Sequence, residues 1–216
     1  AEIILSNPSD SGFDPKPPDD KARPDQAMSY PAKLFHLLAG RHAGGGKPLT
    51  IFPMELIPEN GTVLRTRVLE IAAGQKADPQ LVRWLESCLW VNSLVDRIVS
   101  AALEPVGAVA EPYGLWAIED QPGLELPCRH PDVQRVTSLA PYEMRKLHIL
   151  NLAHTYLVHR WQHEPRSHIR FVREAMAIVG WIAAAIAAFA MDMLEEVQAQ
   201  RARAVEEQHI AFLQII

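Results

Sequence analysis

The chain changes character near residue 140. Before that point, short apolar segments with strand-like composition alternate with helix-like segments. After Pro141, every periodic segment is typical of a helix, with one break near Pro165. A rhythm of strand, helix, strand and helix is typical of an α/β layer built on a parallel sheet. The sequence therefore predicts an α/β part over residues 1–139, followed by an all-α part over residues 140–216.

Six elements are expected in the first part. The predicted strands cover residues 1–5, 49–56 and 114–119, and the predicted helices cover residues 31–46, 61–73 and 78–90. The helix at Pro31 has proline in its first turn and glycines at its end, and Asp78 is suited to cap the third helix. A loop without regular structure is expected up to Ser29, because the prolines between residues 14 and 25 fix φ and remove backbone donors.

The composition is that of an ordinary globular protein. The 216 residues are 48% hydrophobic and 22% charged, and the formal net charge is −5. That charge argues against a nucleic-acid partner, since nucleic-acid binders usually carry a basic surface. Cys88 and Cys128 have no metal-binding or redox spacing and fit free thiols in a reducing cytosol, although the sequence leaves a disulfide open. Because the chain shows no signal-peptide pattern at its start, we predict a cytoplasmic protein.

Residues 175–191 form an uncharged, alanine-rich run. Its length is at the short limit for a membrane span. A buried helix, or a helix that packs on a partner, is therefore the preferred interpretation, and no membrane partner is expected.

The helix that begins at Pro141 carries an unusual set of polar residues. At roughly 100° per residue, Glu143, Lys146, Asn151 and His154 fall within about a 140° arc. One interpretation is a surface ion pair between Glu143 and Lys146, with the asparagine and histidine solvated or satisfied in the core. The other is chemical: a lysine base, an amide that binds a developing alkoxide and a histidine that holds the substrate or moves the proton. That set suits carbonyl reduction or alcohol oxidation with a hydride acceptor.

A metal site is the third possibility for this region, since five of the nine histidines lie between residues 148 and 168. His159 and His163 have the i,i+4 spacing that can chelate zinc. The glutamate of the H-E-x-x-H motif is missing, however, and no nearby carboxylate or cysteine completes a ligand set. We therefore predict no metal.

Several stretches resemble, in order, the motifs of the long-chain polyol-specific dehydrogenases, the mannitol dehydrogenase family. The most specific is "LAPYEMRKLHILNLAHTYL", which is similar to the family pattern P-Y-E followed by K-x-x-x-x-N-x-x-H. Upstream of it stand "SNPSDSGFD", "FPMELIPENG", "VNSLVDRIV" and "EPYGLWAIED", each similar to a family segment. Together they cover residues 3–157. "MELI" and "ILNLAHT" lean toward the tagaturonate reductase (altronate oxidoreductase) members.

The resemblance implies a partial Rossmann-like parallel sheet with a C-terminal helical domain. It also implies NAD-dependent, zinc-independent interconversion of a sugar alcohol or aldonate with its keto sugar or keto-uronate. In this sequence the family motif makes Lys146 the general base, and Asn151 the group that steadies the oxyanion. His154 is expected beside the substrate oxygen or in the proton path, and Glu143 in proton exchange with solvent. The implied partner is a small sugar acid or polyol, and the oligomeric state is left open.

The resemblance assigns further residues to the α/β part. Ser6 and Asn7 are implied at the cofactor, and Asp96 beside both the substrate and the nicotinamide ribose. Mannitol-type members carry a second amide donor at the position of Leu56 here. Asn60 and Asn92 are the candidates to replace that donor at the substrate.

The sequence also departs from the family. A glycine-rich dinucleotide-binding loop is expected upstream of the first strand, and "AGGGK" at residues 43–47 is no substitute because it follows a helix. The chain therefore resembles an N-terminally truncated member, which could be inactive by itself. The alternative hypothesis is a non-catalytic helical interaction module with residues 168–208 as a docking helix.

Overall fold

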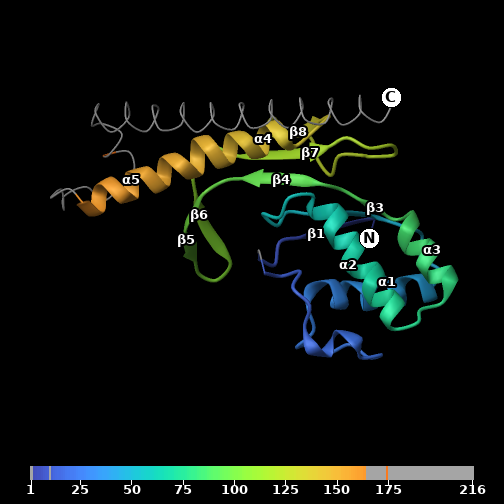
Figure 1. The fold of residues 1–216 in the computed structure, drawn as a ribbon. Coiled ribbons are helices and arrows are strands. Elements are labelled where there is room, and N and C mark those ends of the chain that lie inside the picture. The colour runs from blue at the N-terminus through green and yellow to red at the C-terminus, as the bar shows by residue number, and fades with distance from the viewer. Residues whose placement is uncertain (1, 10, 164–173, 175–216) are drawn as a thin grey trace, which may run out of the picture. The chain divides into compact units, whose positions relative to one another are not determined.

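The computed structural model describes residues 2–9, 11–163 and Glu174 (Figure 1). The chain divides into two compact units, Ala1–Tyr142 and Glu143–Ile216, and each is described by itself. The predicted helices beyond residue 163, including the run at residues 175–191, lie outside the described residues. In the part that is described, no helix is long and apolar enough to cross a membrane.

The first unit confirms the alternation of strands and helices. Its first seven elements are β1 (Ile3–Ser6), the 3₁₀ turn η1 (Pro17–Asp20), α1 (Tyr30–Ala43), β2 (Thr50–Pro53), α2 (Asn60–Gly74), α3 (Pro79–Ser87) and β3 (Leu89–Trp90). Ser29 caps α1 by accepting the N–H of Ala32 at 3.3 Å, and Asp78 caps α3 by accepting the N–H of Gln80 at 2.6 Å. The expectation of an irregular loop up to Ser29 is wrong at η1, because one short turn tolerates prolines at its start.

Strands β1, β2 and β3 form a parallel sheet in that order. Ile51 is fully buried, and its register partners are Ile4 on β1 and Trp90 on β3. The core beneath the sheet joins strand and helix residues, among them Leu38 of α1, Leu64 and Val68 of α2, and Leu85 of α3. The sheet thus fixes where β1 and β2 end, and the residues that follow those ends lie at one edge.

A second, mixed sheet was not predicted. It contains β4 (Ser93–Asp96), β7 (Leu115–Glu119) and β8 (Val133–Val136), with β4 antiparallel and β8 parallel to β7. The strand expected at residues 114–119 is therefore confirmed as β7, but it does not belong to the parallel sheet. The predicted helix over residues 78–90 is too long, because its last apolar residues, Leu89 and Trp90, form β3.

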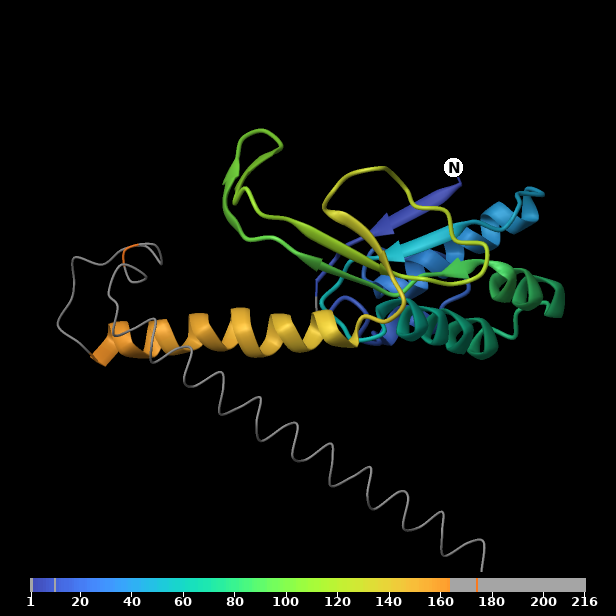
Figure 2. The same ribbon diagram turned by 90° about the horizontal axis from the view of Figure 1, so that it is seen from above.

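Strands β5 (Val99–Leu103) and β6 (Gly107–Ala110) form a hairpin of their own. All of their residues are exposed, and the hairpin extends beyond the sheets of the unit (Figure 2). Both cysteines are free thiols, with Cys88 buried and Cys128 exposed.

The helical segment predicted from Pro141 onward is confirmed as far as the structure describes it. It begins with α4 (Ala140–Arg145), passes through the π-helix η2 (Lys146–Asn151) and continues as α5 (Leu152–His163). The change from α to π geometry was not predicted, since the sequence pattern was interpreted with the period of an α-helix.

Candidate active site

Asn60 is fully buried at the start of α2, and its amide joins three segments of the first unit. Its Nδ2 donates to the carbonyls of Pro53, Glu55 and Ser93 at 3.1, 3.0 and 2.8 Å. Its Oδ1 accepts the N–H groups of Gly61 and Ser93, both at 2.9 Å. Both N–H groups of the amide are thus used by backbone carbonyls. The predicted substrate contact of Asn60 is replaced by a structural role, because no donor remains for a ligand.

Gly61 explains why the motif pairs asparagine with glycine. A Cβ at this position would lie 2.5 Å from the backbone of Val91, which follows β3. Only glycine lets the start of α2 approach β3 this closely. The Asn-Gly pair therefore fixes α2 against the end of the parallel sheet.

Asn92, which is distant in sequence, also stabilises the start of α2. Glu59, at the N-cap of α2, has φ 51° and makes no side-chain cap. The Oδ1 of Asn92 accepts the N–H of Thr62 at 3.0 Å instead, and its Nδ2 donates to Glu119 Oε2 at 2.9 Å. This satisfies one of the N–H groups that a helix start leaves without a partner. The role of Asn92 at the substrate stays a prediction.

Three polar side chains gather where β1 and β2 end. Ser6 is the last residue of β1, Glu55 follows β2, and Tyr30 begins α1. Ser6 is 6% and Glu55 2% exposed, and neither the hydroxyl nor the carboxyl oxygens have a hydrogen-bond partner among the described residues. Burial raises the pKa of Glu55 and outweighs the opposing effect of the polar groups near its carboxyl. Burial likewise raises the pKa of Tyr30, and the nearby Glu55 adds to that shift.

This cluster lies at the carboxyl edge of a parallel sheet, which is where α/β proteins bind ligands. The family resemblance implied Ser6 and the exposed Asn7 at the cofactor, which stays a prediction, and Glu55 and Tyr30 were not among the candidate residues. The missed signal was a glutamate two residues after the end of a buried strand. Asp96, the last residue of β4, is half-buried on the second sheet.

The helical residues of the predicted site belong to the second unit. Lys146 and Asn151 are the first and last residues of η2, and Glu143 lies in α4. Glu143 and Lys146 are half-buried, and Asn151 is exposed. His154 belongs to α5, three residues after Asn151. The four residues thus share one helical segment, as the sequence predicted.

His159 and His163 have neighbouring rings, with centroids 4.3 Å apart. The Nδ1 of His163 donates to the carbonyl of His159 at 2.8 Å, so one ring nitrogen is already in use. Across the residues that the structure describes, no group of three histidine, cysteine or acidic residues could hold a metal ion.

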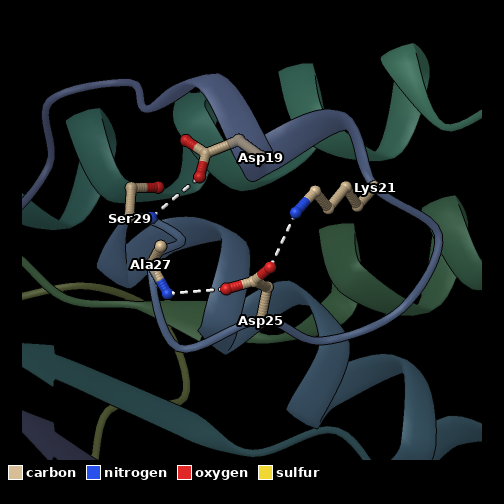
Figure 3. Close-up of polar contacts among 5 residues, drawn as sticks. All are labelled: Asp19, Lys21, Asp25, Ala27 and Ser29. Carbon is tan, nitrogen blue, oxygen red and sulfur yellow. Dashed lines mark hydrogen bonds and ion pairs between the residues drawn. The ribbon is translucent and has the colours of Figure 1, made fainter.

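A cavity of about 250 Å³ lies between the loop before α1 and helix α2, with Phe13 and Ile71 in its wall. Figure 3 shows how the loop at its rim is held: Asp19 accepts the N–H of Ser29 at 2.7 Å, and Asp25 accepts from Lys21 at 2.7 Å. None of the predicted site residues lines this cavity. We therefore assign its polar contacts to loop stability.

The comparisons with known proteins agree with the motifs. Residues 12–127 match the sequence family described as "Mannitol dehydrogenase Rossmann domain", which is more than half of the chain. The chain belongs to the mannitol dehydrogenase family. The family predicted from the ordered motifs is thereby confirmed.

Among relatives in the mannitol dehydrogenase family, the chain is 36% identical over 181 residues to the altronate oxidoreductase of Klebsiella pneumoniae (strain 342), covering 72% of this chain and 37% of that protein. It is 30% identical over 161 residues to the D-mannonate oxidoreductase of Escherichia coli (strain K12), covering 65% and 31%. The chain thus spans about a third of the length of the curated relatives it matches.

A solved structure shows the same fold. The Pseudomonas fluorescens mannitol 2-dehydrogenase in ternary complex with NAD and D-mannitol matches with a TM-score of 0.65 at 23% identity, covering 86% of this chain and 42% of that one. This likeness confirms the Rossmann-like parallel sheet followed by helices.

Proposed function

We propose that the chain is part of an NAD-dependent oxidoreductase that interconverts a sugar alcohol or aldonate with its keto sugar or keto-uronate, on the tagaturonate–altronate side. The observation that carries the proposal is the set Lys146, Asn151 and position 154 on one continuous helix of a mannitol dehydrogenase family member. The 36% identity to an altronate oxidoreductase supports this choice of substrate. A cytoplasmic location stays a prediction.

In this proposal Lys146 is the general base that takes the proton of the substrate hydroxyl. The amide N–H of Asn151 binds the oxygen as it becomes alkoxide-like, which stabilises the transition state more than the ground state. His154 lies beside that oxygen or passes the proton on, and Glu143 exchanges the proton with solvent. When bound, NAD supplies the hydride acceptor.

The residues of the first unit fit the nicotinamide end of the cofactor. The buried Ser6 hydroxyl and Glu55 carboxyl have no partner among the described residues, and they lie at the edge where α/β sheets bind dinucleotides. We assign Ser6, Asn7 and Asp96 to this end of the site. Residues 1–139 would then be the cofactor part and residues 140–216 the substrate part. The glycines at residues 44–46 end α1, so they do not form a phosphate-binding turn between a strand and a helix.

The test is NADH consumption with tagaturonate by the 216-residue chain. Lys146→Ala is expected to lower the rate roughly 10²- to 10⁴-fold, the range for loss of a general acid or base. Lys33→Ala, at an exposed lysine of α1, is the matched control and should leave the rate unchanged. A fully active Lys146→Ala protein would refute the assigned role.

The alternative is a non-catalytic helical interaction module. It is favoured by one observation: no glycine-rich turn joins a strand to a helix within the described residues. Titrating NADH into the 216-residue chain, with fluorescence or calorimetry as readout, separates the two. Saturable binding supports the oxidoreductase, and its absence supports the module.

A further inference from the structure

The helix that carries the proposed catalytic residues is not regular. α4 ends at Arg145, and α5 begins at Leu152. Between them the six residues Lys146–Asn151 form the π-helix η2. Such segments are rare, and single π turns inside α-helices are frequent at functional sites. Here Lys146 opens the π segment and Asn151 closes it.

Asn151 stands five positions after Lys146, which is the wrong spacing for two side chains to meet on an α-helix. At about 100° per residue, the two would lie about 140° apart. The side chains that meet on an α-helix are three or four residues apart. In a π-helix the N–H of residue i+5 bonds to the carbonyl of residue i, so residue i+5 lies above residue i. η2 therefore brings Lys146 and Asn151 to a common face.

The backbone after Asn151 extends this face by one turn. Position 154 lies three residues further on, in α5, and residues three apart are neighbours on an α-helix. The hydroxyl of Thr155 donates to the carbonyl of Asn151 at 2.9 Å. This bond holds Asn151 where the π-helix passes into the α-helix.

We infer that η2 is a positioning element, which sets the Lys146 amine and the Asn151 amide side by side so that both act on one carbon–oxygen bond. The inference rests on the function proposed above and deepens it. It assigns the role to the backbone, because the π turn makes the five-residue spacing productive. The residues between positions 146 and 151 are then spacers.

Engineered histidine pairs test the geometry without any need for activity. The pair Lys146→His with Asn151→His, five apart, should bind Ni²⁺ only if the turn is π. The pair Lys146→His with Ile149→His, three apart, should bind Ni²⁺ only if the turn is α. Each single variant is measured as well, since it reports the contribution of the native histidines. Ni²⁺ affinity is read by calorimetry on the 216-residue chain, and circular dichroism checks that each variant is folded.

The inference predicts that the 146/151 pair binds Ni²⁺ more tightly than its two single variants together account for, by on the order of tenfold, a usual coupling for groups in contact. The 146/149 pair should show no such gain. Three results would overturn the inference. A gain for the 146/149 pair alone would mean an α-helical turn, and equal gains for both pairs would mean a variable one. No gain for either pair would mean that the segment is not helical.

A second arm asks whether the geometry serves the reaction. In the double variant Leu150→Asn with Asn151→Leu, the amide moves to the position that suits an α-helix. We expect kcat for NADH-dependent reduction of tagaturonate to fall at least tenfold, with KM little changed, because the amide acts in the transition state. Unchanged kcat would overturn the positioning role. If the 146/151 histidine pair binds Ni²⁺ as predicted but the native chain never consumes NADH, the proposed function fails and the geometry stands.

Discussion

Replacing Asn60 by alanine should lower the free energy of unfolding more than removing any other polar side chain of the first unit, judged by the hydrogen bonds of the described residues. Two of its carbonyl partners keep another donor: Pro53 accepts the Ser93 hydroxyl at 2.6 Å, and Glu55 accepts the Ile57 N–H at 2.8 Å. Three buried groups lose their partner, namely the N–H of Gly61 and both backbone groups of Ser93. At about 1 kcal/mol or more for each unsatisfied group, the loss is about 3 kcal/mol.

Thermal unfolding followed by circular dichroism measures this loss. For a chain of this size, it corresponds to a fall in Tm of roughly 6 to 12 °C. Asn92→Ala is the matched control, since its half-buried amide makes fewer bonds, and about 1 kcal/mol is expected. Asn60→Asp keeps the shape but places an oxygen against three carbonyl oxygens, so it should be no more stable than Asn60→Ala. An Asn60→Asp protein that melts with the native chain would refute the reasoning.

Three further outcomes follow from buried groups. Because burial raises the pKa of Glu55, the unfolded chain ionises first, and the native chain should lose stability as pH rises above 4.5, the ordinary pKa of the group. Glu55→Gln should remove this loss, and parallel Tm-against-pH curves for the two proteins would contradict it. Gly61→Ala should lower Tm by several degrees in the same assay, because the new Cβ would lie 2.5 Å from the backbone of Val91. An unchanged Tm would mean that α2 can shift to make room. A thiol reagent should modify Cys128 in the folded chain and Cys88 only after unfolding, so two reactive thiols in the folded state would contradict the described burial.

The elements with local signals were predictable. Pro31 and Asp78 mark helix starts, and the glycines after Ala43 mark a helix end. β2 was predicted because a buried parallel strand is apolar throughout. The family followed from motif order, which no single motif would have carried.

The elements that were missed depend on tertiary contacts. Leu89 and Trp90 continue the apolar pattern of α3, so only pairing with β2 shows that they form a strand. The hairpin residues 99–110 are exposed on both faces, so they show no alternation of polar and apolar positions. The role of Asn60 was misjudged because its partners at Pro53 and Ser93 come together only in the fold. A π turn has no pattern of its own in an interpretation that assumes 3.6 residues per turn.

The proposed amine at position 146 can be removed and then restored chemically. Lys146→Cys should abolish NADH-dependent reduction of tagaturonate, and treatment with 2-bromoethylamine, which converts the new thiol to a lysine analogue, should restore the rate. The native chain treated in the same way controls for modification at Cys128. Recovery of the rate only in the treated variant is the predicted result. Full activity before treatment, or a folded, fully alkylated variant that stays inactive beside an active native chain, would contradict the lysine base.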